Sequence, residues 1–126
     1  MQYKKEHPNE EAGVFDAIVA AVRHIWTFPV PAEASVGSFE NEISINHFFT
    51  DRSARRTFKR AIDLQEWCNT KLIGRNRPER VDFTSEPLLL CHLDLHHENI
   101  MIGEDNALYI IDWEMAGVYP LIMEQY

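Results

Sequence analysis

The feature that most constrains the fold of this 126-residue chain is a predicted β-hairpin late in the sequence. Two short apolar runs, Ile100–Ile102 and Leu108–Ile111, are separated by the turn-forming segment Gly103–Asn106. Glycine, aspartate and asparagine between two such runs are a strong hairpin signal. The sequence therefore predicts a hairpin over Ile100–Ile111, with its two outer ends side by side.

Polar residues gather at both ends of this hairpin. The apolar run Leu88–Cys91, predicted as a strand, leads into a polar loop that ends at Asn99, and Asp112 directly follows the second hairpin strand. Because the hairpin brings its ends together, Asn99 and Asp112 are predicted to lie close in space. Amide and carboxylate oxygens suit a hard cation such as Mg²⁺. Asp94, on the preceding loop, is expected within reach of a substrate hydroxyl beside that metal.

This arrangement suits phosphoryl transfer, in which one carboxylate deprotonates the acceptor while other groups hold a metal on the phosphates. The pattern H-x-D-x-x-x-x-N, then a hairpin, then D, is the signature of the kinase fold. The segment His92–Ile100 resembles the catalytic loop of the aminoglycoside phosphotransferase and choline kinase family, which typically reads H-G-D-L-H-x-x-N. The segment Ile111–Gly117 is similar to that family's metal loop, I-D-W/F-E-x-A-G, and Tyr119-Pro120 continues in the style of its fungal members.

The resemblance implies a role for five residues. Asp94 would be the catalytic base, and Asn99 and Asp112 would be the metal ligands. His92 would be a structural hydrogen-bonding residue beneath the catalytic loop, and His96 would support the loop backbone. The resemblance also implies ATP and Mg²⁺ as cofactors, and phosphorylation of a hydroxyl group on a small molecule.

The implied fold is α+β and mostly helical: a partial protein-kinase-like C-lobe, with two helices packed behind a hairpin that the catalytic and metal-binding loops flank. We expect one domain over residues 1–126, with residues 1–8 flexible and the motif core at 88–120. Leu93 stands where the family usually has glycine, which puts the local backbone conformation in question.

Upstream of the motif, apolar residues at helical spacing predict an amphipathic helix over Asn9–Trp26, ended by Pro29 and Pro31. The segment Ala32–Asn46 has no regular apolar period and is predicted to be a loop. His47–Phe49 is a small apolar patch.

A second helix is predicted over Ala54–Leu72. Asp51 or Ser53 would cap its start, and Gly74 would end it. Arg75–Pro87 is then a polar link to the motif.

The net charge of −8 is unevenly distributed. Residues 54–80 hold eight basic and three acidic side chains, and residues 81–126 hold nine acidic and none basic. So acidic a chain is a poor general binder of nucleic acid or anionic membrane, and neither is expected as a partner. A cationic small-molecule acceptor would suit the acidic segment. The basic block is interpreted as the solvated face of a helix.

No secretory signal and no membrane-length apolar run are present, and Cys68 and Cys91 do not form a disulfide framework. We expect a cytoplasmic protein and an inert thiol at Cys68, since no base adjoins it in sequence. The oligomeric state is left open.

A complete kinase also needs a glycine-rich loop and a lysine that pairs with the nucleotide phosphates. The five glycines are far apart, and no such lysine is identifiable. The expectation is therefore a C-lobe truncated at both ends, with incomplete kinase activity. The alternative, from another class, is a catalytically inactive remnant that binds a partner through exposed apolar surface.

A third hypothesis is a metal-dependent hydrolase using His92, His96 and Asp112. Cys91, His92, His96 and His97 suggest zinc, but no second pair of ligands stands at the spacing of a structural site, so no zinc is expected.

Overall fold

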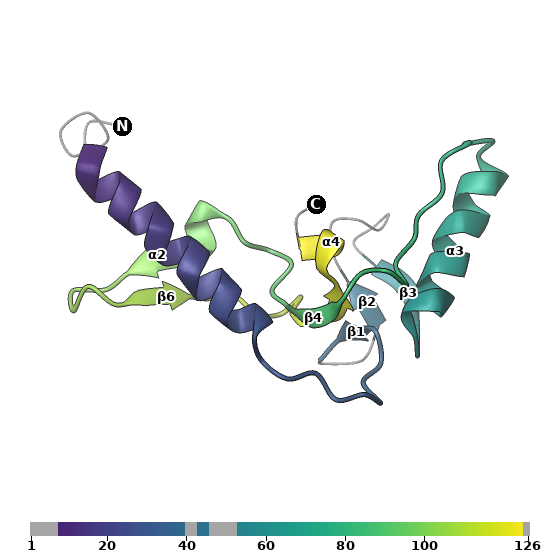
Figure 1. Ribbon diagram of the computed structural model, residues 1–126, viewed down its shortest axis with the longest axis horizontal. Coiled ribbons are helices and arrows are strands. Elements are labelled where there is room, and N and C mark those ends of the chain that lie inside the picture. Colours follow the sequence, from purple (N-terminus) through teal and green to yellow (C-terminus); the bar gives the residue numbers. More distant parts are fainter. Residues whose placement is uncertain (1–7, 40–42, 46–52, 125–126) are drawn as a thin grey trace.

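The computed structural model describes residues 8–39, 43–45 and 53–124, and over these ranges it is an α+β structure (Figure 1). The predicted α+β class is therefore confirmed. The helical elements are α2 (Pro8–Trp26), α3 (Ala61–Gly74), the 3₁₀ helix η2 (His97–Asn99) and α4 (Leu121–Glu124). The strands are β1 (Gly37–Ser38), β2 (Ile43–Ile45), β3 (Ser53–Thr57), β4 (Leu88–Cys91), β5 (Ile100–Ile102), β6 (Leu108–Ile110) and β7 (Gly117–Pro120). No helix within these described ranges is long and apolar enough to cross a membrane.

All strand pairs of the described residues are antiparallel. β7 is the central strand of a three-stranded sheet, with Val118 opposite Leu90 of β4 on one side and Gly37 of β1 on the other. A side chain at Gly117 would collide with the carbonyl of Gly37, so this close strand pair requires glycine there. β2 pairs with β3, and β5 pairs with β6. In Figure 1 the hairpin lies at one end of the molecule, α3 at the other, and the three-stranded sheet with α4 between them.

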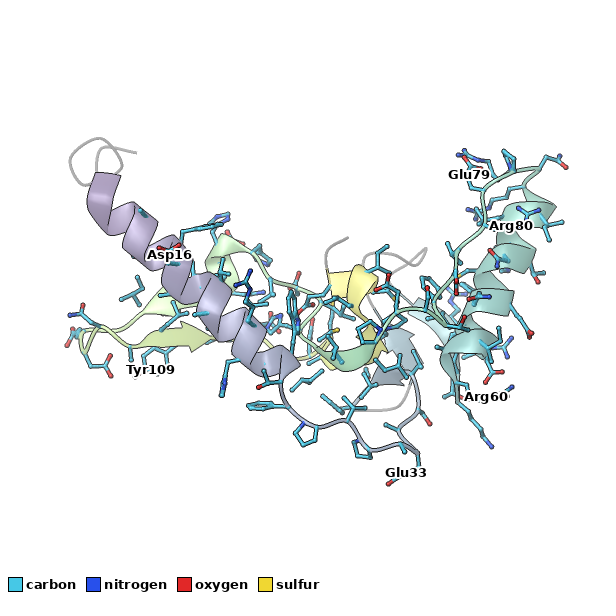
Figure 2. All side chains as sticks on the ribbon, viewed as in Figure 1. Asp16, Glu33, Arg60, Glu79, Arg80 and Tyr109 are labelled. Atoms are coloured by element: carbon cyan, nitrogen blue, oxygen red, sulfur yellow. The ribbon has the colours of Figure 1, made fainter. Side chains whose placement is uncertain are left out.

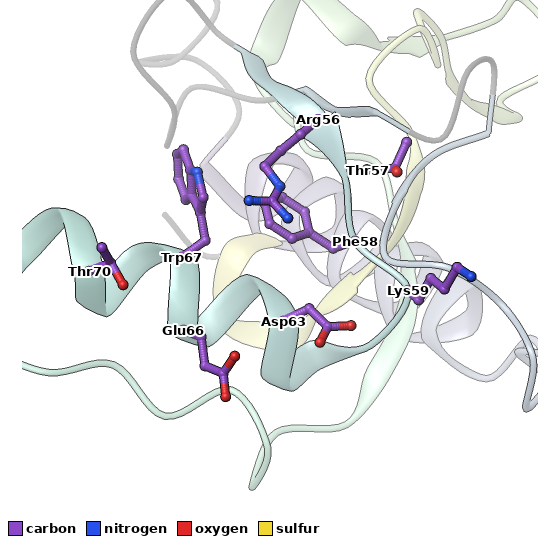
Figure 3. Close-up of a pocket in the computed structure, with 8 residues that line it drawn as sticks. All are labelled: Arg56, Thr57, Phe58, Lys59, Asp63, Glu66, Trp67 and Thr70. Carbon is purple, nitrogen blue, oxygen red and sulfur yellow. The ribbon is translucent and has the colours of Figure 1, made fainter.

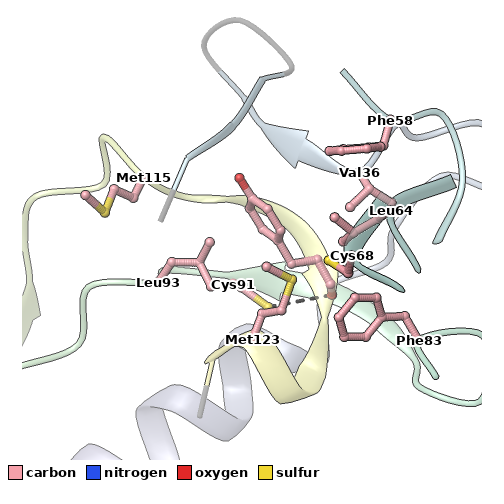
Figure 4. Packing of buried hydrophobic residues seen from close by; sticks show 10 residues of the cluster. Val36, Phe58, Leu64, Cys68, Phe83, Cys91, Leu93, Met115 and Met123 are labelled. Atoms are coloured by element: carbon pink, nitrogen blue, oxygen red, sulfur yellow. Dashed lines mark hydrogen bonds between the residues drawn. The ribbon is translucent and has the colours of Figure 1, made fainter. Parts of the chain in front are cut away.

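The hydrophobic core lies where α3, the three-stranded sheet and α4 meet (Figure 4). Its buried members come from these elements and from loops beside them: Val36, Phe58, Leu64, Cys68, Phe83, Cys91, Leu93, Met115, Tyr119 and Met123. Full burial of such a side chain contributes roughly 1.5–3 kcal/mol. Because α3 packs here through Leu64 and Cys68, the expected packing of both helices behind the hairpin is wrong for α3. Leu93 and Met115 belong to the loops before and after the hairpin, so the core fixes both loops.

Three predicted elements are confirmed. The helix predicted over Asn9–Trp26 is α2, which begins one residue earlier and packs against β4. The strand at Leu88–Cys91 is β4. The hairpin predicted over Ile100–Ile111 is the β5–β6 pair, with Met101 opposite Tyr109. Each of these elements has a strong local signal, either a helical apolar period or turn residues between apolar runs.

The helix predicted over Ala54–Leu72 is wrong in its first part. β3 occupies the start of that range, so Ser53 is a strand residue rather than a helix cap, and α3 begins only at Ala61. Arg60, labelled in Figure 2, is the N-cap: its backbone N–H donates to the Asp63 carboxylate at 3.0 Å. The Arg60 guanidinium binds the same carboxylate and lowers the pKa of Asp63. Pairing of β3 with β2 overrides the local helical signal.

The segment Ala32–Asn46, predicted as a loop, contains β1 and β2, so this prediction is also wrong in part. β1 is held by β7, which comes much later in the chain and which no local pattern reveals. Pro8 is the first residue of α2, and residues 1–7 lie outside the described residues, as do the apolar patch His47–Phe49 and the proposed cap Asp51.

Candidate active site

The two halves of the sequence motif meet at the open end of the hairpin. The catalytic loop follows β4 and ends in η2, and Asp112 follows β6. The backbone N–H of Ile111 donates to the carbonyl of Asn99 at 3.0 Å. This hydrogen bond extends the β5–β6 ladder by one step, so the backbones of Asn99 and Ile111 are adjacent at the point where Asp112 begins.

His92 connects the catalytic loop to the segment after the hairpin. Its buried ring accepts a hydrogen bond at Nδ1 from the backbone N–H of Asp94, at 3.2 Å. Its Nε2 lies 2.9 Å from the carbonyl oxygen of Ile111. Because the first partner can only donate and the second can only accept, the ring carries its proton on Nε2. The Trp113 ring meets it edge to face, with centroids 4.6 Å apart. Both ring nitrogens are thus engaged by backbone groups, which argues against the hydrolase hypothesis, where His92 is a metal ligand.

Leu93 adopts the left-handed backbone conformation, with φ 66°. This conformation favours glycine, the residue usual at this position in the family that the motif resembles, and costs a side-chain-bearing residue roughly 1–2 kcal/mol. The Leu93 side chain is buried in the core. Its backbone N–H donates to Oε2 of Glu124 at 2.7 Å, and the N–H of His92 donates to Oε1 at 3.0 Å.

Asp94 and Asn99 are joined through the Asn99 amide. Its Nδ2 donates to the backbone carbonyl of Asp94 at 2.9 Å and to the Asp94 carboxylate at 3.0 Å. Two oxygen acceptors on one side fix the amide orientation, since only the NH₂ group can donate to them. Within the described ranges, Oδ1 of the buried Asn99 accepts no hydrogen bond. That oxygen is available to a cation.

His96 supports the loop from within. Its Nδ1 accepts from the backbone N–H of Glu98 at 3.3 Å, which caps η2. The other ring nitrogen, Nε2, lies 3.5 Å from the Asp94 carboxylate and 3.1 Å from Nδ2 of Asn99. The Asp94 side chain, 18% exposed, is therefore flanked by Asn99 and His96 while still open to solvent.

Asp112 is exposed and also adopts the left-handed conformation, with φ 61°. Such conformations in non-glycine residues concentrate at functional sites. Its carboxylate makes no hydrogen bond to other residues of the described part. The next residue, Trp113, is anchored by its indole N–H, which donates to the Ile110 carbonyl at 2.8 Å.

The donor set fits Mg²⁺. The Asn99 amide oxygen and the Asp112 carboxylate are hard oxygen ligands, and Mg²⁺ is usually held by one or two carboxylates together with substrate phosphates and water. In the part of the chain that the structure describes, no three His, Cys, Asp or Glu side chains gather around one point. The described residues therefore form no dedicated all-protein cage of these side chains.

Comparison with known families decides the relationship. The chain matches the model of the phosphotransferase enzyme family over residues 2–124. The chain belongs to the phosphotransferase enzyme family. This match confirms the motif resemblance at the level of the family. No solved structure matches the chain.

One residue near the site of this phosphotransferase-family chain was missed from the sequence. Glu124 lies on α4 and binds the catalytic loop across a separation of more than thirty residues. No spacing pattern links α4 to the loop, so a contact map is needed to find the pair.

The two cysteines are free and buried. Burial raises the pKa of Cys68 to about 11 and that of Cys91 to about 12, where the nearby Glu124 carboxylate adds to the rise. The Cys91 thiol donates to the Tyr119 carbonyl (Figure 4). Both side chains are protonated at neutral pH, and we assign them to the core of this phosphotransferase-family chain rather than to its chemistry.

An open pocket of about 460 Å³ lies between β3 and α3 (Figure 3). Phe58 and Trp67 line it together with charged side chains of both signs, including Arg56 and Glu66. None of the motif residues contributes to its wall.

Proposed function

We propose that this chain carries the catalytic and metal-binding loops of an ATP-dependent phosphotransferase, a kinase that phosphorylates a hydroxyl group of a small molecule. The Asn99 amide carries the proposal: Nδ2 holds Asp94, while Oδ1 is left without a hydrogen bond among the described residues. Oδ1 is not a fully buried atom, so it is open to solvent and a cation can reach it. Family membership supports phosphoryl transfer as the chemistry.

In this proposal Asn99 and Asp112 hold Mg²⁺ through their side-chain oxygens. The bound metal and ATP supply charge neutralisation and the phosphoryl group. Asp94 accepts the proton of the acceptor hydroxyl as the oxygen–phosphorus bond forms and the bond to the leaving nucleotide breaks. Asn99 holds the Asp94 carboxylate in one orientation by a hydrogen bond, and orientation of this kind is a large part of catalysis.

The acceptor is proposed to be a small hydroxylated molecule, and a cationic one suits the charge. Nine acidic and no basic side chains occupy residues 81–126. Amino alcohols and aminoglycosides would be attracted to such a segment more strongly than neutral sugars.

A second candidate is a catalytically inactive module that binds a partner. Large apolar side chains on the hairpin and the metal loop are 40–52% exposed: Met101, Ile102, Tyr109, Ile111 and Trp113. The sequence also has no glycine-rich phosphate loop. Exposed apolar groups of this size favour association.

A transfer assay separates the two candidates. The chain is incubated with Mg²⁺ and ATP labelled in the γ-phosphate, against cationic amino alcohols, aminoglycosides and neutral sugars. Transfer that falls roughly 100-fold or more in Asp94→Asn, and is unchanged in the exposed hairpin-turn variant Glu104→Gln, supports the kinase. Folded protein that transfers to none of these acceptors supports the inactive module.

A further inference from the structure

Glu124 binds the catalytic loop with both of its carboxylate oxygens. Oε1 accepts from the backbone N–H of His92 at 3.0 Å and Oε2 from that of Leu93 at 2.7 Å. Hydrogen bonds from an N–H to an ionised carboxylate are shorter and stronger than neutral ones. α4 is thus fastened to the loop by one side chain, at the two residues that directly precede Asp94.

The backbone at this point is one that leucine does not prefer. Leu93 has φ 66°, in the left-handed region. Two interactions oppose its relaxation: the N–H bond to Glu124, and the burial of the Leu93 side chain beside Met115 and Cys91 in the core. A glycine here would adopt the same conformation without strain. This chain therefore depends on contacts that a glycine-bearing loop would need less.

The conformation at Leu93 determines where Asp94 lies. The N–H of Asp94 bonds to Nδ1 of His92 only because the chain turns at Leu93. The Asp94 carboxylate in turn meets Asn99. If the turn relaxed, both bonds would be lost, although neither involves Glu124.

We propose that Glu124 is a positioning residue: its carboxylate holds Leu93 in the left-handed turn and thereby positions the Asp94 carboxylate beside Asn99 in the candidate active site. That Asp94 is the proton acceptor rests on the function proposed above. The coupling of Glu124 to the turn does not depend on it.

Amide hydrogen exchange measured by NMR on the free chain tests the coupling. In Glu124→Gln one oxygen acceptor is replaced by an NH₂ group. We expect the amide of Asp94 to exchange roughly tenfold faster or more, the range for loss of a hydrogen bond to a charged group. The control Glu104→Gln makes the same chemical change on the exposed hairpin turn and should leave this amide unchanged.

The same Glu124→Gln change in a Leu93→Gly variant separates positioning from simple stabilisation. Glycine adopts the left-handed turn without help from Glu124. In that variant Glu124→Gln should therefore change the exchange rate of the Asp94 amide less than roughly threefold relative to Leu93→Gly alone. An equal acceleration in both backgrounds would overturn the proposal, as would no acceleration in the parent chain. The amides of Leu90 and Val118 report global unfolding, and if they accelerate as much as Asp94, Glu124 acts on overall stability and the proposal fails.

The hydrogen-exchange experiment needs no bound nucleotide, so it tests the positioning role separately from the proposed function. If the exchange results hold but no phosphoryl transfer is found, the proposed function fails and the positioning role stands. If phosphoryl transfer is found but Glu124→Gln leaves the exchange of the Asp94 amide unchanged, the proposed function stands and the positioning role fails.

Discussion

The side-chain amide of Asn99 donates to both the backbone carbonyl and the carboxylate of Asp94, at 2.9 and 3.0 Å. The residue that we propose as a metal ligand therefore also orients the residue that we propose as the base. In the proposed function, one amide therefore couples metal binding to base orientation, and loss of Asn99 should affect both.

Replacing Asn99 with alanine tests how much its hydrogen bonds to Asp94 stabilise the loop. Two hydrogen bonds to Asp94 are lost, one of them to a carboxylate, so we expect the free energy of unfolding to fall by about 1–3 kcal/mol. Urea titration measures the fall. The exposed control His97→Ala should stay within about 0.5 kcal/mol of the parent chain. An Asn99→Ala chain as stable as that control would show that the amide contributes little to the loop.

At most positions an alanine variant is more stable than a glycine variant, and at Leu93 we predict the opposite order of stability. Both Leu93→Ala and Leu93→Gly lose the buried side chain, but only alanine retains the strain at φ 66°. The left-handed penalty of roughly 1–2 kcal/mol exceeds the extra backbone entropy of glycine, about 0.5–1 kcal/mol. We therefore expect Leu93→Gly to be the more stable variant in urea. If Leu93→Ala is the more stable, the turn is not held in this conformation in solution.

The imidazole of His92 should be hard to replace. His92→Phe keeps a ring against Trp113 but leaves the Ile111 carbonyl and the Asp94 N–H without their partner. A fully buried group left unpaired costs about 1–3 kcal/mol, and these two hydrogen bonds are part-buried. We expect the free energy of unfolding to fall by about 1–3 kcal/mol in total, measured by urea titration. A loss no larger than that of an ordinary surface substitution would contradict the bridging role.

The buried thiols predict a fall in stability at alkaline pH. Burial raises the pKa of Cys68 to about 11, so the folded chain keeps the proton after the unfolded chain has lost it. The stability that the buried Cys68 thiol contributes is complete below its pKa in the unfolded chain, about 8.5. It is lost as pH rises through the thiol's pKa in the folded chain. We expect the parent chain to lose stability between about pH 8.5 and pH 11 more steeply than Cys68→Ala. Parallel pH curves for the two would show that the thiol is not buried in solution.

The sequence predicted the motif-bearing half of the fold better than the rest. Residues of the hairpin and of β4 are fixed by short-range signals, so Ile100–Ile111 and Leu88–Cys91 were predicted within a residue. β1 depends on β7, which comes much later in the chain, while β2 and β3 pair with each other, and the residues of β3 were predicted as the start of a helix. Strand pairing overrode the local helical pattern there.

The candidate site likewise combines residues that carry a local sequence signal with residues that carry none. Asp94, Asn99 and Asp112 were selected from their positions around the hairpin, and His92 from the resemblance of the loop to the family's catalytic loop. The left-handed turn at Leu93 was not predicted; leucine in place of the family's usual glycine only put the local backbone conformation in question. Glu124 carried no sequence signal, since its partners lie more than thirty residues earlier in the chain.

The most direct test of the central claim is a calorimetric titration of the chain with ATP, with and without Mg²⁺. The proposed function predicts binding that requires Mg²⁺, is lost in Asp112→Ala, and is retained in Glu104→Ala, which removes the same charge from the exposed hairpin turn. Folded protein that binds no nucleotide, or that binds it equally well without Mg²⁺ and in Asp112→Ala, would contradict the assignment of Asn99 and Asp112 as metal ligands.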